Sequence, residues 1–167
     1  MVPHCVAGVM EEMGLLGLRI QRMPAEPWTL FADPAAYPYL SVASPSSHDM
    51  TPIRGWWEEA DRAVIQLYYN RVLNHGGVAP KTCETWICRQ IVGLHLHSSS
   101  IWAVFPIQDI LGMSAELRRP DPREERINEP ADAHNRWNFR LHLSIETLLS
   151  QASFNAEILS QVRSSYR

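Results

Sequence analysis

The chain has 167 residues, which is long enough for one ordinary domain with a hydrophobic core. Hydrophobic residues make up 46% and charged residues 20% of the chain, a balance typical of globular rather than disordered proteins. A net charge of −3 provides no basic surface for nucleic acid or anionic membrane, and no apolar run approaches the roughly 18 residues that span a bilayer.

The first half of the chain contains one predicted helix and two predicted strands. Apolar residues recur at helical spacing over 5–13, and Gly14 can end that helix in the left-handed conformation. Residues 17–23 alternate like a strand. Residues 23–38 contain four prolines and are predicted to form an irregular loop. A second strand is predicted over 39–43.

Longer helices follow. Thr51 and Pro52 resemble a helix N-cap with proline at the first helical position. The pattern then predicts one long amphipathic helix over 53–73 and a second helix over 82–97. The continuous apolar run at 101–105 is typical of a strand that is buried on both faces.

The last part of the chain contains a polar segment followed by a helical one. Residues 117–138 are polar and proline-rich, which predicts a loop. Residues 144–163 have helical periodicity with an interruption around 150–153. The three strands are separated by connections long enough for crossovers, which favours a parallel sheet. Three strands leave both sheet edges open, so the chain is interpreted as part of a larger domain.

One short segment combines reactive side chains with a favourable position. His48 and Asp49 follow the strand at 39–43 and precede a helix. Catalytic side chains of parallel α/β proteins lie at this place, on loops at the carboxyl ends of strands. Asp49 is therefore a candidate catalytic residue, although a carboxylate here can also simply cap the helix.

The sequence resembles the 4-α-glucanotransferases of glycoside hydrolase family 77, most of all the plant cytosolic disproportionating type. Order and spacing agree across nearly the whole chain. The matching blocks are MEEMGLLGLRIQRMP at 10–24, SPSSHD at 44–49, IWAVFPIQD at 101–109, EERINEP at 124–130 and WNFRLH at 137–142.

The resemblance implies the fold. The catalytic domain of this family is a (β/α)₈ barrel, and such a closed barrel usually needs about 250 residues. We therefore expect residues 1–167 to be the C-terminal part of that barrel, without a second domain. Strands six, seven and eight would lie at 18–21, 39–43 and 101–105.

The resemblance also implies the chemistry. The family retains anomeric configuration, which requires one carboxylate as nucleophile and another as general acid/base. Neither of the family's two motifs for these groups occurs in this sequence. We therefore expect the complete enzyme to transfer α-1,4-glucan units from maltose or maltodextrins to an acceptor glucan, and this chain alone to be inactive. The alternative is a non-catalytic protein that binds glucan or another protein.

Four residues are expected to form the site. By resemblance, Asp49 is a third carboxylate that stabilises the distorted sugar, and His48 hydrogen-bonds the same sugar. Asn128 is expected to contact glucan, although its loop position can be purely structural. Trp56 can stack on a sugar ring, but core packing is at least as plausible for Trp56 and Trp57.

Two local features qualify this picture. The family usually has Thr three residues after the aspartate, where this chain has Pro52, and the loop geometry there can differ. Gln108 and Asp109 follow the last strand and are expected to orient neighbouring backbone and side chains rather than to contact glucan.

A metal site is not expected. Cys83, Cys88, His95 and His97 could suggest zinc, but a four-residue gap between cysteines is not a usual structural-zinc spacing. Two histidines two positions apart on a helix also point to different sides. The resemblance implies no cofactor.

The expected location is the cytosol. Three cysteines without a disulfide framework suit a reducing compartment. The first residues lack the basic and apolar regions of a secretory signal.

Overall fold

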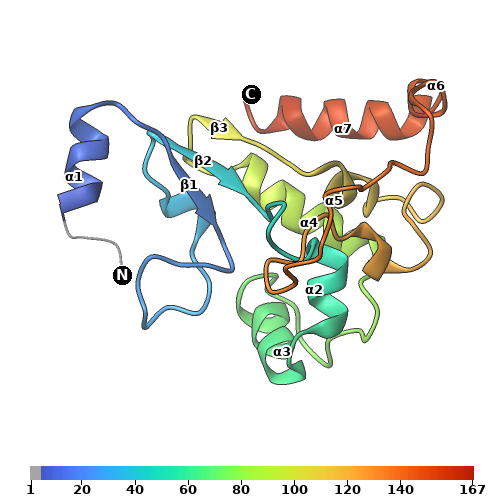
Figure 1. The fold of residues 1–167 in the computed structure, drawn as a ribbon, viewed down its shortest axis with the longest axis horizontal. Helices are drawn as coiled ribbons and strands as arrows, with labels where there is room; N and C mark the ends of the chain where they lie inside the picture. The colour runs from blue at the N-terminus through green and yellow to red at the C-terminus, as the bar shows by residue number, and fades with distance from the viewer. Residues whose placement is uncertain (1–4) are drawn as a thin grey trace.

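The computed structural model describes residues 5–167 and shows an α/β fold with a three-stranded parallel sheet (Figure 1). Residues 1–4 of the unit expected over 1–167 lie outside the described residues. The strands pair in the order β1-β2-β3, with Val42 of the central strand opposite Leu18 and Trp102. The expectation of parallel strands is confirmed. The strands are β1 (Gly17–Ile20), β2 (Ser41–Ser44) and β3 (Trp102–Ala103).

Helices α2 to α5 gather on one side of the sheet, while α1 lies beyond β1 at the opposite end (Figure 1). As predicted, Gly14 has a left-handed φ of 65° after the first helix, and the C-terminal helical region is broken in two. The helices are α1 (Cys5–Glu12), α2 (Ile53–Glu59), α3 (Arg62–Arg71), α4 (Thr85–Leu96), α5 (Ile107–Leu111), α6 (Ile145–Leu149) and α7 (Ala152–Ser164), with 3-10 turns η1 (Pro34–Ala36) and η2 (Pro122–Glu125).

The prediction of one helix over 53–73 is wrong. Helix α2 ends at Glu59, and Ala60 is extended with a ψ of 159°. Asp61 then caps α3, because its side chain accepts a hydrogen bond from the N–H of Ala63 at 2.7 Å. An aspartate at this point offers the backbone a helix start that competes with helix continuation. The periodicity alone did not reveal this break.

The predicted N-cap at Thr51 is also wrong. Pro52 occupies the cap position and no capping side chain from the helix's own start is present. The N–H of Ile53 instead donates to Oδ1 of Asp109 at 2.7 Å, across the fold. The hydroxyl of Thr51 accepts a hydrogen bond from Arg126. The carboxylate of Asp109 therefore makes the contact at the start of α2 that the local sequence assigned to Thr51.

The run at 101–105 is not buried on both faces as expected. The strand is only Trp102–Ala103, and the Trp102 and Val104 side chains are 59% and 55% exposed. Within residues 5–167, β3 pairs only with β2 and β1 pairs only with β2. Both edges of the sheet are open, so apolar strand residues remain uncovered.

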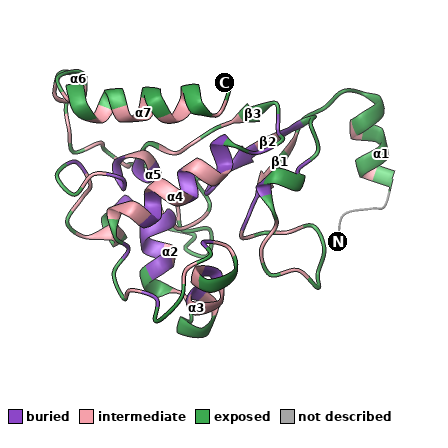
Figure 2. Cartoon of the chain, turned by 180° about the vertical axis from the view of Figure 1, so that it is seen from behind, coloured by how far each residue is buried: buried purple, intermediate pink, exposed green. Residues whose placement is uncertain are grey.

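The hydrophobic core lies between helices α2, α3 and α4. Figure 2 shows buried residues concentrated on α2 and α4, whereas α1, α6 and α7 expose most of their residues. Trp57 is fully buried there and donates from its indole N–H to the carbonyl of Pro80 at 3.0 Å. Core packing is thus the role of Trp57. The largest core side chains include Ile53, Trp57, Ile65, Tyr68, Leu73 and Ile87.

In the part of the chain from residue 5 to 167, no helix combines the length and apolar character needed to cross a membrane.

Candidate functional site

The loop that connects β2 to α2 presents His48 and Asp49. Nε2 of His48 lies 3.2 Å from Oδ2 of Asp49, and the two side chains are 54% and 52% exposed. His48 is therefore not a buried imidazole. Asp49 does not cap α2 either, because the helix begins at Ile53 without a side-chain cap. The pair is accessible to a ligand.

The side chain of Asn128 completes the pair from a distant loop. Its Nδ2 donates to Oδ1 of Asp49 at 2.7 Å, and its Oδ1 accepts from Nδ2 of Asn135 at 2.5 Å. Because a carboxylate only accepts and each amide donates in turn, the amide of Asn128 has one orientation in this chain of bonds. The tertiary structure thus brings together three of the four expected site residues.

Trp137 is a member of the site that the sequence did not single out. Its ring lies 4.7 Å from the imidazole of His48 with a tilt of 49°, and the side chain is 61% exposed. The sequence does not mark Asn135 either. The available signal was that Trp137 begins one of the blocks that carry the family resemblance. An exposed indole beside polar hydrogen-bonding groups suits a ligand that is apolar on one face and polar at its edges.

Trp56 lies in a different cluster. Its ring makes edge-on contacts with Phe31 at 6.3 Å and Tyr68 at 5.0 Å between centroids. The guanidinium of Arg22 lies 4.9 Å from the ring centroid. These contacts favour packing for Trp56, and its stacking on sugar stays a prediction.

The loop that carries Asn128 is tied to α2 through a buried ion pair. Arg54 and Glu125 are in direct contact, with side chains that are 4% and 3% exposed. Gln108 adds a hydrogen bond from Nε2 to the carbonyl of Glu125 at 3.2 Å. This confirms the expectation that Gln108 orients neighbouring backbone, and it fixes the chain three residues before Asn128.

Asp109 also orients its neighbours as expected. It is buried, and its two oxygens accept hydrogen bonds from the Ser46 hydroxyl and from the N–H of Ile53. Burial raises the pKa of Asp109, and these hydrogen bonds oppose that rise.

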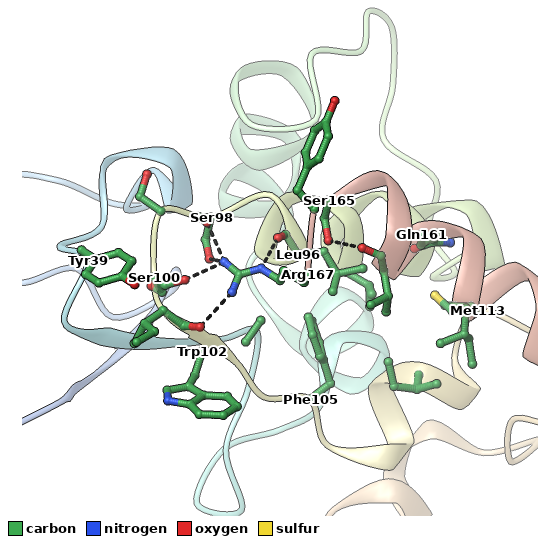
Figure 3. A pocket seen from close by; sticks show the side chains of 18 residues that line it. Tyr39, Leu96, Ser98, Ser100, Trp102, Phe105, Met113, Gln161, Ser165 and Arg167 are labelled. Atoms are coloured by element: carbon green, nitrogen blue, oxygen red, sulfur yellow. Dashed lines mark hydrogen bonds between the residues drawn. The ribbon is translucent and has the colours of Figure 1, made fainter.

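A cavity of 690 Å³ lies elsewhere, between β3, the end of α4 and α7 (Figure 3). None of His48, Asp49 and Asn128 lines it. The guanidinium of Arg167 at its rim donates to the carbonyls of Leu96 and Ser100 at 2.7 and 2.6 Å, so it is already engaged (Figure 3). Apolar side chains of β3, α4 and α7 line much of the cavity, beside the serines at 98–100.

Comparison with known proteins identifies the family. The sequence model of the family described as 4-alpha-glucanotransferase, glycoside hydrolase family 77, matches residues 1–146. The chain belongs to this family. The resemblance seen in the sequence blocks is thereby confirmed.

Two curated relatives show how much of a family member the chain represents. It is 40% identical over 167 residues to the 4-alpha-glucanotransferase DPE2 of Oryza sativa subsp. japonica, covering 100% of the chain but 18% of the rice protein. It is 29% identical over 168 residues to the 4-alpha-glucanotransferase of Chlamydia trachomatis, covering 93% of the chain and 29% of that protein. The chain therefore spans less than a third of either relative.

A solved structure shows the same fold. The amylomaltase from Streptococcus agalactiae, solved in complex with acarbose, matches 100% of the chain and 30% of its own length with a TM-score of 0.71. Sequence identity to it is 18%, so this likeness concerns the fold. The site roles of Asp49, His48, Asn128 and Trp56 stay predictions.

Proposed function

We propose that this chain forms part of the active site of a 4-α-glucanotransferase and that Asp49 is its catalytic contribution. The observation that supports this most directly is the meeting of Asp49, His48 and Asn128, which come from two loops far apart in the sequence. The intact protein would cleave an α-1,4 link in a donor such as maltose or a maltodextrin. It would then transfer the glucan unit to an acceptor glucan with retention of configuration.

Asp49 would act on the sugar rather than on the scissile bond. Retaining transfer passes through oxocarbenium-like transition states, and hydrogen bonds to sugar hydroxyls strengthen there. The accessible carboxylate of Asp49 can accept such bonds, and His48 can add a bond to the same sugar. The Asn128 amide holds one carboxylate oxygen and leaves the other oriented by His48.

The nucleophile and the acid/base would come from the remainder of the protein. We propose that residues 1–167 belong to the C-terminal part of the catalytic barrel. The parallel sheet has two open edges and uncovered apolar residues that further strands would cover, which supports its being part of a larger barrel. Removal of a nucleophile abolishes a covalent route. The 167-residue chain by itself should therefore show no turnover.

The test measures glucose release from maltose with glycogen as acceptor, using the intact protein that carries this sequence. Asp49→Asn should lower kcat by about 100-fold or more, because it removes a charge that acts in the transition state. Asp132→Asn, a matched change in the loop that carries Asn128, should leave kcat unchanged. Full activity of Asp49→Asn would contradict the proposed role.

Binding without turnover is the alternative outcome. An intact protein that binds maltodextrin, loses that binding in Asp49→Ala and shows no transfer would be a glucan-binding protein. Turnover by the purified 167-residue chain would contradict its dependence on carboxylates that lie outside it.

We also propose a cytosolic location. The exposed Cys5 and the buried Cys83 and Cys88 are free thiols, which suits a reducing compartment. One relative, DPE1 of Arabidopsis thaliana, is named as chloroplastic/amyloplastic. Detection of the intact protein in isolated plastids would contradict a cytosolic location.

A further inference from the structure

Asp109 of α5 connects two points of the loop that carries His48 and Asp49. The Ser46 hydroxyl donates to Oδ2 of Asp109, and the N–H of Ile53 donates to Oδ1 at 2.7 Å. Ser46 lies two residues before His48, and Ile53 lies four residues after Asp49. Both oxygens of one carboxylate therefore hold the two ends of this loop.

Arg22, which follows β1, holds the same loop. One nitrogen of its guanidinium, Nη2, donates to the carbonyls of Pro45 and Thr51, both at 3.0 Å. The guanidinium also lies over the ring of Trp56. Side chains from the connections after β1 and after β3 thus fix the backbone of the connection after β2.

Apart from the bond from Asn128 to Asp49 and the contact of His48 with Trp137, the tip of the loop has only local restraints. The N–H of Asp49 donates to the Ser47 hydroxyl at 3.3 Å, and the N–H of Met50 donates to the Ser47 carbonyl at 3.2 Å. These are local turn contacts. The direction in which Asp49 points therefore depends on where the two ends of the loop are held, in addition to the bond from Asn128.

Burial works against the charged form of Asp109 and raises its pKa. The carboxylate is 1% exposed, and none of the ion pairs within 4 Å among residues 5–167 includes it. Burying a carboxylate without an ion pair is unfavourable unless hydrogen bonds compensate. Bonds to a charged acceptor are shorter and about twice as strong as neutral ones, which suits a group that must hold a geometry.

We propose that Asp109 and Arg22 are positioning residues for the glucan site, which fix residues 45–52 so that His48 and Asp49 meet Asn128. The proposal rests on the proposed function of that site. Neither residue needs to touch the substrate. Their effect would be on the placement of Asp49 in the transition state.

The experiment compares Asp109→Ala with Asp109→Asn in the intact protein. Alanine removes both contacts. Asparagine keeps both, because its carbonyl can accept from the N–H of Ile53 and its amide can donate to the Ser46 hydroxyl. We expect Asp109→Ala to lower kcat by about 100-fold with little change in KM, since misplacement by about 1 Å has effects of that size. Asp109→Asn should restore most of kcat.

A second measurement reports the loop without using activity. Hydrogen exchange of the peptide that covers residues 45–53 should become faster in Asp109→Ala and return towards the original rate in Asp109→Asn. Arg22→Met, which removes the two bonds to Pro45 and Thr51, should also accelerate it. Asp132→Asn is the control and should leave both exchange and kcat unchanged.

The outcomes separate this inference from the proposed function. A folded Asp109→Ala protein with unchanged kcat and unchanged exchange overturns the positioning role, even if Asp49→Asn is inactive. An unmodified protein without glucan transfer overturns the proposed function, while faster exchange in Asp109→Ala still supports the restraint on the loop. Should Asp109→Ala fail to fold, Ser46→Ala removes one contact only and should lower kcat by roughly 10-fold; an unchanged kcat in a folded Ser46→Ala protein contradicts the inference.

Discussion

Nδ2 of Asn128 lies 2.7 Å from Oδ1 of Asp49, although 79 positions separate the two residues in the sequence. Asp49 belongs to the connection between β2 and α2, and Asn128 follows η2. The buried Arg54–Glu125 pair and the bonds to Asp109 hold the two segments in reach of each other. The site is thus assembled by buried side chains that lie outside the loop tips carrying Asp49 and Asn128.

The Asn128 contact should matter for transfer. Asn128→Ala removes a hydrogen bond to a charged group, and such bonds contribute about 1.5 to 3 kcal/mol. We expect kcat/KM of the intact protein to fall by roughly 10-fold or more. Asn135→Ala should have a smaller effect, because Asn135 acts through the amide of Asn128. An equal loss in Asn138→Ala, an exposed residue of the same loop, would contradict a specific role for Asn128.

Trp137 should provide a surface for a sugar ring. Trp137→Ala should weaken binding of maltoheptaose by about 10-fold, and Trp137→Phe by less, because an aromatic face is retained. The side chain is 61% exposed, so stability should change by no more than about 0.5 kcal/mol. Calorimetric titration measures the affinity. Trp28→Ala is the control, since Trp28 is 82% exposed and lies in the loop at 23–38. If both variants bind equally well, Trp137 has no such role.

Gly55 allows the close approach of Thr51 to α2. A Cβ at position 55 would lie 2.3 Å from Cγ2 of Thr51, a distance that forces a shift. Gly55→Ala should lower stability by about 1 to 3 kcal/mol and displace the loop next to Asp49. Thr51→Ser in the same protein removes the clashing methyl group and keeps the hydroxyl that accepts from Arg126.

The double variant Gly55→Ala/Thr51→Ser tests whether the clash with the Thr51 methyl group causes the loss of stability. Without the Thr51 methyl group, alanine at position 55 should stabilise the helix by about 1 kcal/mol relative to glycine. The stability of the double variant should therefore equal or exceed that of the unmodified protein. Thermal unfolding of the two single variants and the double variant measures this. A double variant that is no more stable than Gly55→Ala alone would show that Thr51 is not the obstacle.

His95 should make stability depend on pH. Burial lowers its pKa from 6.5 to about 4, while the bond from Nδ1–H to the carbonyl of Ile91 at 2.8 Å opposes that shift. Between these values the unfolded chain binds a proton that the folded protein does not. The stabilisation is therefore complete above pH 6.5 and is lost as pH falls towards 4, with a total on the order of 3 kcal/mol.

Unfolding by denaturant between pH 4 and pH 7.5 tests this dependence. The stability of the unmodified protein relative to His95→Leu should fall as the pH is lowered through this range. His97→Gln is the control, because His97 is exposed. A difference between the unmodified protein and His95→Leu that is constant with pH would contradict the neutral, buried state of His95.

The sequence by itself determined the family, the order of the strands and most of the helices. Strand and helix periodicity is a local property, so α1, α4 and the interrupted C-terminal helices lie close to where the pattern predicts them. Asp49, His48 and Asn128 could be named because they lie in blocks shared with the family.

Only the tertiary structure decided how those residues meet and what surrounds them. The helix predicted over 53–73 breaks at Ala60, and the start of α2 is capped by Asp109 from 56 positions away. Trp137 and Asn135 lie beside His48 and Asn128, and Trp56 packs against Phe31 and Tyr68. Periodicity reports which side of an element is apolar, but long-range hydrogen bonds depend on how loops from different strands come together. The way in which these loops meet is set by the folded sheet, and no single segment of the sequence determines it.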